Sequence, residues 1–389
     1  MFIRSLKLKN FRNYIDLEID FVPGLIVLHG GNGQGKSNLL EAMHLLSLTK
    51  SYRTDRDREI MRLGEDEEAR HTRIEGAFST KGDKKIVVRV DLSLSPENPP
   101  FDIGKGILSK RINVNGISRR ALNAVGTVRS VLFTAEDIEL VVGPPSVRRR
   151  FLDVLLSQID RTYLRTLRGY QKILVQRNHL LRLIAEGNAN LQELEFWDGE
   201  LASSGAFIMA QRMIALSELS LFSQRAYRDI VKDSESIQVV YETSVEVNQT
   251  PLDLSAQIRS HLQIVQSREI RLGKTLIGPH RDDIKLLLNG VDAAKYTSRG
   301  QQRSLALAIR LGEAYFMYQR LEEEPILLLD DVLSEIDSER QEQILQGVRK
   351  FQQSVIAVVE PLRHVNLFDA ECTFYHVRQG GIELDRQNE

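Results

Sequence analysis

The sequence predicts an α/β protein in which one α/β domain is built from both ends of the chain and a mainly helical domain is inserted between them. Apolar and polar residues alternate near the N-terminus, as they do in strands, and this pattern returns after Leu276. Between positions 146 and 234 the chain has no proline and few glycines, and its apolar residues recur at helical spacing. We therefore expect residues 1–135 and 272–389 to form the α/β domain and residues 136–271 to form the insert.

The first part of the chain predicts a layer of strands with one helix. The apolar run LIVLH at residues 25–29 precedes a glycine-rich stretch and fits a short buried strand. Asn115-Gly116 follows an alternating segment and is typical of a two-residue hairpin turn. The expected elements are strands at residues 2–8, 15–19, 25–29, 85–94 and 111–114, and a helix at residues 37–48.

The insert predicts helices. From Leu156 to Ile184 apolar residues recur at spacings of 3, 4 or 7, which indicates one face of a long helix or of a helical hairpin. Residues 186–190, rich in Gly and Asn, are the expected turn. Further along we expect helices at residues 191–231, 252–266, 304–321 and 339–351, and strands at residues 236–247, 285–288, 326–329 and 354–359.

Composition excludes several classes of protein. Lys and Arg number 52 and Asp and Glu 53, so net charge argues neither for nor against a nucleic-acid partner. Cys372 is the single cysteine, which excludes an internal disulfide and a zinc site of the paired-cysteine type. The N-terminus lacks the apolar core of a signal peptide, and the longest apolar runs are too short to cross a bilayer. We expect a soluble, cytoplasmic protein.

A phosphate-binding loop follows the strand at residues 25–29. The segment Gly30-Gly31-Asn32-Gly33-Gln34-Gly35-Lys36-Ser37 matches the pattern G-x-x-x-x-G-K-[ST] between a strand and a helix. Glycines allow backbone N–H groups to converge on phosphate oxygens at the positive end of a helix. We expect ATP here, with Lys36 on the β- and γ-phosphates and the Ser37 hydroxyl as a ligand of Mg²⁺.

Two acids end a buried strand in the last part of the chain. Asp330 and Asp331 follow the apolar run at residues 326–329. Adjacent acids in such a place are costly to bury unless they face a cation. We expect Asp330 to hold Mg²⁺ and Asp331 to orient or activate the attacking water. The alternative is an acidic cap on the next helix.

A third motif lies between the other two. Ser298, Gly300 and Gln301 resemble the L-S-G-G-Q signature of ABC ATPases, whereas Thr297 and Arg299 depart from it. The resemblance implies that this helix start contacts the γ-phosphate of ATP bound by a second copy of the chain, so that ATP cements a homodimer. Residues 334–337 resemble the D-loop at the same interface. Read alone, Ser298 is equally well an ordinary helix cap.

The chain as a whole resembles the RecF family of bacterial recombination and repair ATPases. About 260 residues separate Lys36 from Ser298, more than in transporter ATPases and fewer than in relatives with long coiled coils. The motifs that carry the resemblance are FRNY at 11–14, NLLEA at 38–42, KSYRT at 50–54, RRRFLD at 148–153, QRN at 176–178, GPHRDD at 278–283, the run 298–308 and DDVLSE at 330–335. Through these motifs the resemblance also implies that Arg12, Asn38 and Arg53 approach the nucleotide.

Two features depart from the family pattern. The strand after the carboxylates ends in Val358-Val359-Glu360-Pro361, where family members have Ser or Thr and other ABC ATPases have His. The γ-phosphate sensor therefore has no evident residue. No glutamine is identified for the Q-loop either.

Basic residues form two groups. Lys110 and Arg111 lie in the first part, and Arg161, Arg165, Arg168 and Lys172 follow one another at helical spacing on a face opposite the apolar stripe. By themselves such residues are more often a solvated face. The resemblance implies that they bind DNA, with strong salt dependence and little sequence preference.

The resemblance implies an ATP-gated DNA clamp for recombinational repair and replication. ATP would close the homodimer on single- or double-stranded DNA, and a slow, DNA-stimulated hydrolysis would open it. RecR and RecO are the implied partners, and recombinase loading at gaps is the implied task. Two alternatives stay open: an ATPase subunit of a transporter, which the long insert disfavours, and a module that senses ATP without hydrolysing it, which the intact Asp330-Asp331 pair disfavours.

Overall fold

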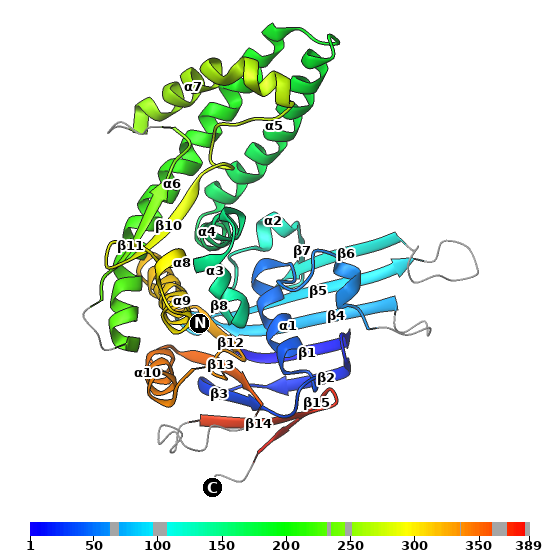
Figure 1. Cartoon of the computed structure of the whole chain (residues 1–389). Coiled ribbons are helices and arrows are strands. Elements are labelled where there is room, and N and C mark those ends of the chain that lie inside the picture. The colour runs from blue at the N-terminus through cyan, green and yellow to red at the C-terminus, as the bar shows by residue number, and fades with distance from the viewer. Residues whose placement is uncertain are drawn as a thin grey trace. The chain divides into compact units, whose positions relative to one another are not determined.

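A computed structural model describes residues 1–62, 70–95, 107–231, 235–245, 251–334, 336–359 and 372–385. The chain forms two compact units. The first comprises Met1–Asp137, Arg225–Ser234 and Arg303–Glu389, and the second comprises Ile138–Gln224 and Glu235–Gln302. The first unit is mixed α/β and unites both ends of the chain, as expected (Figure 1). The proposed domain boundaries at 135/136 and 271/272 stay a prediction.

A mainly parallel sheet forms the centre of the first unit. Its order is β15-β14-β3-β13-β12-β8, and only β15 runs antiparallel to its neighbour. The central strands are buried almost throughout, as continuous apolar runs in a covered parallel sheet should be. The strands are β3 (Gly24–His29), β8 (Ser130–Thr134), β12 (Ile326–Asp330), β13 (Gln353–Val358), β14 (Cys372–Arg378) and β15 (Gly381–Leu384).

A second, antiparallel sheet lies in the same unit, in the order β2-β1-β4-β5-β6-β7. Its residues alternate between buried and exposed, because one face meets the core and the other does not. The predicted hairpin is confirmed, with positive φ at both Asn115 and Gly116. The strands are β1 (Phe2–Phe11), β2 (Tyr14–Asp20), β4 (His71–Ser79), β5 (Lys85–Ser95), β6 (Ile107–Val114) and β7 (Ile117–Arg119).

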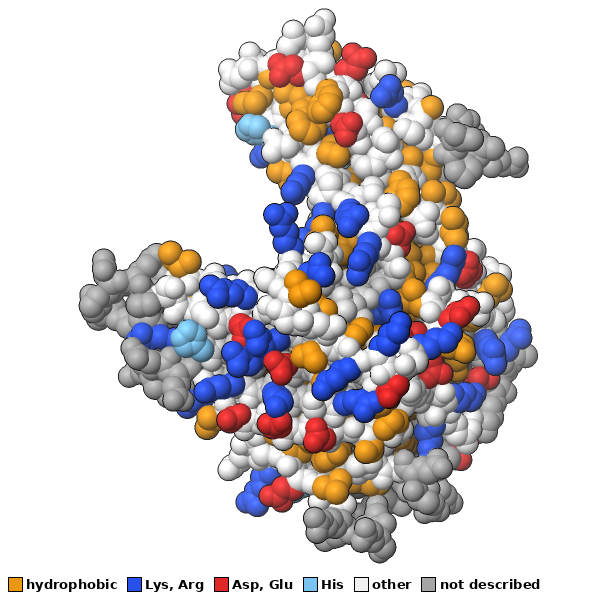
Figure 2. All heavy atoms as spheres, turned by 180° about the vertical axis from the view of Figure 1, so that it is seen from behind, with side chains coloured by type: hydrophobic (Ala, Val, Ile, Leu, Met, Phe, Trp, Pro, Cys, Tyr) orange, Lys and Arg blue, Asp and Glu red, His pale blue; other side chains and the backbone are white. Residues whose placement is uncertain are grey.

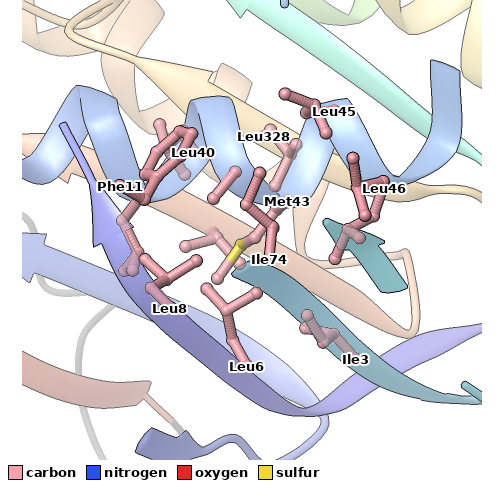
Figure 3. Close-up of a cluster of buried hydrophobic side chains, with 14 of the residues drawn as sticks. Ile3, Leu6, Leu8, Phe11, Leu40, Met43, Leu45, Leu46, Ile74 and Leu328 are labelled. Atoms are coloured by element: carbon pink, nitrogen blue, oxygen red, sulfur yellow. The ribbon is translucent and has the colours of Figure 1, made fainter. Parts of the chain in front are cut away.

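Helix α1 (Lys36–Leu48) lies between the two sheets and joins their cores. Figure 3 shows Leu40, Met43 and Leu46 of α1 facing Leu6 and other side chains of β1 and β4. The same cluster includes buried residues of β3, β12 and β13 from the other sheet. The start of α1 is therefore fixed from both sides. The unit also contains α2 (Ala121–Ala124), α10 (Ser338–Val348) and most of α9 (Arg299–Leu321).

The second unit is mainly helical. Helices α5 (Arg161–Ala185) and α6 (Leu194–Val231) are joined by the predicted turn, in which Gly187 has positive φ. The expected long helix is divided at Asp160. The extended backbone of this residue ends α4 (Pro145–Ile159), and its side chain accepts the N–H of Thr162 and caps α5. The other elements are α3 (Glu139–Val142), α7 (Pro251–Leu272), α8 (Ala293–Tyr296), and a small sheet of β9 (Ile237–Glu242), β10 (Asp283–Leu288) and β11 (Val291–Asp292).

Helix α6 carries charged groups that hold this unit together. The fully buried Arg177 guanidinium donates to Asp198 of α6 and to Glu269 of α7, both at 2.7 Å. Arg212 of α6 donates to Asp153 at 2.7 Å. Among the described residues, one helical stretch, Leu191–Val231, is long and apolar enough to cross a membrane. Core helices of soluble proteins meet the same criteria of length and composition. Asp198 and Arg212 of this helix are buried, and their ion pairs tie it to its neighbours in the unit.

Candidate nucleotide site

The predicted phosphate loop connects β3 to α1 and needs glycine at both ends. Gly30 has φ +146°, and a Cβ there would lie 2.3 Å from the carbonyl oxygen of Val377. Gly35 has φ +123°, and a Cβ there would lie 2.8 Å from the side chains of Asn13 and Tyr14. Any other residue would displace these neighbours. The crest between the two glycines, Gly31, Asn32 and Gly33, is exposed.

Two other segments hold the loop in place. Asn13 Nδ2 donates to the carbonyl oxygen of Gln34 at 2.9 Å, and Tyr14 OH donates to that of Gly35 at 3.0 Å. From the turn between β14 and β15, the N–H of Gly380 also donates to the Gln34 carbonyl, at 3.2 Å. The loop conformation therefore depends on residues from both ends of the chain.

Lys36 lies under the loop. Its Nζ donates to the carbonyl oxygens of Gly30 at 2.6 Å and of Gly31 at 2.8 Å. The side chain is buried, and burial lowers the pKa of the ammonium against the opposing effect of Asp331 and Asp330. A cation held against a glycine-rich loop at the start of a helix is suited to the phosphates of a nucleotide.

The structure brings Ser37 and Asp330 together, although 293 positions separate them. Ser37 Oγ donates to Asp330 Oδ1 at 2.7 Å, at the carboxyl end of β12. A hydroxyl and a carboxylate beside a phosphate loop form the oxygen-rich set that Mg²⁺ prefers, so the residues fit this ion. Tyr52 is a third member of this group, which no sequence motif indicated as part of a metal site: its OH donates to Asp330 Oδ2 at 2.9 Å. Burial, aided by the Asp330 carboxylate, raises the pKa of the Tyr52 phenol well above its ordinary value.

Arg12, Asn38 and Arg53 lie around a buried acid of α1, Glu41. The Arg12 guanidinium donates to both oxygens of Glu41, at 2.9 and 2.7 Å. Arg53 Nη1 donates to Asn38 Oδ1 at 2.6 Å, and Asn38 Nδ2 donates to the Asn13 side chain at 2.8 Å. These residues form one network behind the loop. Its centre, Glu41, was not predicted as a site residue. The sequence does show an acid within the mostly apolar run at residues 39–46, and the structure buries it fully.

Ser298 and Gln301 form a reciprocal cap at the start of α9, in the second unit. Gln301 N–H donates to Ser298 Oγ at 3.3 Å, and Ser298 N–H donates to Gln301 Oε1 at 3.0 Å. Gln301 Nε2 also donates to Glu235 at 2.8 Å. Ser298 is exposed and Gly300 half-buried. Within a single chain Ser298 therefore caps helix α9. Its role toward the nucleotide of a second copy stays a prediction. Two residues of other predicted motifs, Glu335 in the segment that resembles the D-loop and Glu360 at the expected position of the γ-phosphate sensor, lie outside the described residues.

The two basic groups differ. Lys110 Nζ donates to both oxygens of Asp57 at 2.9 Å and to the Thr49 carbonyl at 2.7 Å. Its ammonium group is therefore paired with a carboxylate of the same unit. Arg111 is exposed. On α5, the side chains of Arg161, Arg165, Arg168 and Lys172 are all exposed, and none makes an ion pair with a described residue. Figure 2 shows Lys and Arg side chains on the helical part of the chain and also spread over the rest of this face.

Comparison with known proteins identifies the family. The family model "RecF/RecN/SMC N terminal domain" matches residues 2–382. DNA replication and repair protein RecF of Heliobacterium modesticaldum is 37% identical over 100% of both chains, and that of Chloroflexus aggregans is 38% identical over 96% of both.

Solved structures agree with this. A structure of RecF with ATP, described as a recombination mediator of the RecFOR pathway, superposes with a TM-score of 0.86 at 30% identity, over 99% of this chain and 97% of that one. An Smc head bound to the C-winged helix domain of ScpA superposes with a TM-score of 0.54 at 14% identity, over 99% and 98%, and shares the fold. The predicted fold class, an ABC-type ATPase head with a helical insert, is confirmed, and the chain belongs to the RecF family.

Proposed function

We propose that this chain is an ATP-dependent DNA-binding protein of replication and recombinational repair. The observation that carries the proposal is the 2.7 Å contact between Ser37 and Asp330 beside a glycine-rich loop that contains Lys36. The relatives described as DNA replication and repair proteins, and the related structure with ATP, support it. Nothing in these comparisons supports a transporter subunit.

The site would bind and hydrolyse Mg·ATP. The N–H groups of residues 30–37 and the Lys36 ammonium would hold the phosphates, and Ser37 and Asp330 would hold Mg²⁺. The ion would neutralise negative charge on the phosphates as the γ-phosphoryl group is transferred to water and ADP leaves. Asp331, one residue beyond the metal carboxylate, would orient the attacking water. We expect turnover to be slow without DNA.

ATP would join two copies of the chain. Ser298, Gly300 and Gln301 would face the nucleotide of the other copy, with the N–H groups of the first turn of α9 toward its γ-phosphate. The basic face of α5, together with Arg111, would hold DNA phosphates irrespective of sequence. RecR and RecO are the proposed partners, as the RecFOR pathway of the related structure suggests, and the cytoplasm is the proposed location.

Replacing the loop lysine tests the site. Lys36→Met removes the cation from beneath the phosphates, and we expect ATP affinity to fall by at least about 100-fold, the cost of truncating one partner of a desolvated charge pair. Calorimetric titration with ATP and Mg²⁺ measures the loss.

The matched control is Lys9→Met, which removes an exposed lysine of β1 in the same unit. It should leave the affinity unchanged. Retained ATP affinity in Lys36→Met would refute the proposed site. Phosphate release by the wild-type protein, with and without DNA, tells an ATPase from a module that only senses ATP.

A further inference from the structure

Two donors from different segments fix the Asp330 carboxylate. Ser37 Oγ, at the start of α1, donates to Oδ1 at 2.7 Å. Tyr52 OH, from the loop after α1, donates to Oδ2 at 2.9 Å. Each carboxylate oxygen thus has its own hydroxyl partner, and rotation of the carboxylate would break both contacts.

The side chain of Tyr52 is itself held firmly. The preceding residue, Ser51, is buried; its hydroxyl donates to Glu41 and accepts the N–H groups of Arg53 at 3.0 Å and Thr54 at 3.2 Å. The Tyr52 ring meets the ring of His44 edge-on, with centroids 5.9 Å apart. A donor anchored at its backbone and at its ring is preorganised and does not have to be ordered when the metal binds.

We propose that Tyr52 is a positioning residue for the metal site: it holds Asp330 in the orientation that places a carboxylate oxygen beside Ser37 for Mg²⁺. The proposal rests on the proposed function, since it assumes that Mg·ATP binds at this loop. Tyr52 acts through Asp330 and does not itself touch the metal or the nucleotide. Outer hydrogen-bond partners of metal ligands commonly contribute 10- to 100-fold to metal affinity.

A purely structural role would have a different signature. The same hydrogen bond also links the loop after α1 to strand β12, so its loss could lower the stability of the first unit alone. In that case nucleotide binding would change equally with and without metal. A positioning role instead predicts a change that appears only when the metal takes part.

The test is Tyr52→Phe in the full-length chain, which removes the hydroxyl and keeps the ring against His44. Binding of a fluorescent ATP analogue is titrated with Mg²⁺, and the binding of Mn²⁺ to the nucleotide complex is followed by electron paramagnetic resonance. We expect the metal concentration at half-saturation to rise about tenfold. Binding of the analogue in EDTA should stay within about twofold of wild type, because Lys36 and the loop are untouched.

Two further variants complete the design. Tyr375→Phe is the matched control, because its OH donates to the Asp20 carbonyl at 3.0 Å in the same unit and not to a group of the proposed metal site. It should leave the metal dependence unchanged. In an Asp330→Asn background, Tyr52→Phe should change nucleotide affinity by less than about twofold, because the residue through which it acts has been altered.

An unchanged metal half-saturation in Tyr52→Phe overturns the proposal. So does an equal loss of affinity with and without metal, which would assign Tyr52 a structural role. A wild-type chain that binds no ATP at any Mg²⁺ concentration overturns the proposed function and the Tyr52 assignment with it. If the wild-type chain binds ATP normally and Tyr52→Phe has the same metal half-saturation as wild type, the Tyr52 assignment alone is overturned.

Discussion

Asp331 occupies an unusual backbone conformation. Its φ is 52°, in the left-handed region, where Asp and Asn are tolerated better than most residues. The backbone N–H donates to the carbonyl of Ala357 in β13 at 3.2 Å, and the side chain is exposed. Asp330 is engaged by Ser37 and Tyr52, whereas the Asp331 carboxylate has no hydrogen-bond partner among the described residues. Of the two acids, Asp331 is therefore the one placed to meet water.

Asp331→Asn keeps shape and backbone tolerance and removes the charge. We expect ATP affinity to stay within a few fold and turnover to fall roughly 10²- to 10⁴-fold, the usual contribution of a positioned base. Calorimetry and phosphate release measure the two quantities. Asp16→Asn, an exposed acid of β2, is the matched control. Wild-type turnover in Asp331→Asn would mean that the attacking water is organised elsewhere.

At the scale of elements, hydrophobic patterning predicted the buried parallel strands β3, β12 and β13 and most of the helices. It did not show that α4 and α5 are separate, because Leu156 and Tyr163 continue the same 7-residue spacing across the break. A single polar residue, Asp160, caps α5 there, and one N-cap carries little signal in an amphipathic stretch. Strands β4, β8, β14 and β15 were not predicted either.

Site residues that belong to a contiguous sequence motif could be predicted. Site residues that meet only because the chain folds could not. The loop around Lys36 and the Asp330-Asp331 pair follow from sequence, since their spacing alone indicates phosphate and metal chemistry. Tyr52 on Asp330 required the packing of the loop after α1 against β12. Likewise, Lys110 resembled a DNA contact because nothing in the sequence places Asp57 within 2.9 Å of it.

Helix α5 is the element on which DNA binding can be tested. Replacing Arg161, Arg165, Arg168 and Lys172 with Ala removes four exposed cations from one face. We expect weaker DNA binding and a salt dependence whose log–log slope is smaller by up to about 3.6, at roughly 0.9 for each phosphate contact with duplex DNA. ATP binding should persist, because these residues belong to the second unit and Lys36 to the first. Binding isotherms at several salt concentrations provide the measurement.

The control for this test removes the same amount of charge from another part of the second unit. Arg259, Arg268, Arg271 and Lys274 are exposed residues of α7 and of the segment just after it. Their replacement with Ala should leave DNA affinity and its salt slope close to wild type. If the two quadruple variants lose affinity equally, the effect is one of net charge, and α5 has no special role.

The whole-molecule hypothesis is that two copies of the chain share each nucleotide. Ser298→Arg places a bulky cation at the start of α9 and leaves the loop around Lys36 untouched. Each monomer should therefore still bind ATP, whereas closure of the pair, and with it hydrolysis, should fail. Sedimentation velocity with and without ATP measures closure. The conservative Ser298→Thr keeps the capping hydroxyl and serves as the control.

Mixing two defective chains separates a shared site from a folding defect. In a dimer of Ser298→Arg with Lys36→Met subunits, one composite site lacks both the lysine and the facing serine, while the other keeps both. If the interface is two-fold and self-complementary, as the hypothesis requires, the intact site can give up to about half of normal turnover when one site suffices, and none when both must act. Either chain alone has no intact site, so any recovery on mixing requires residues from two subunits. If Ser298→Arg dimerises normally on adding ATP, Ser298 does not serve the other subunit, and the clamp mechanism loses its main support.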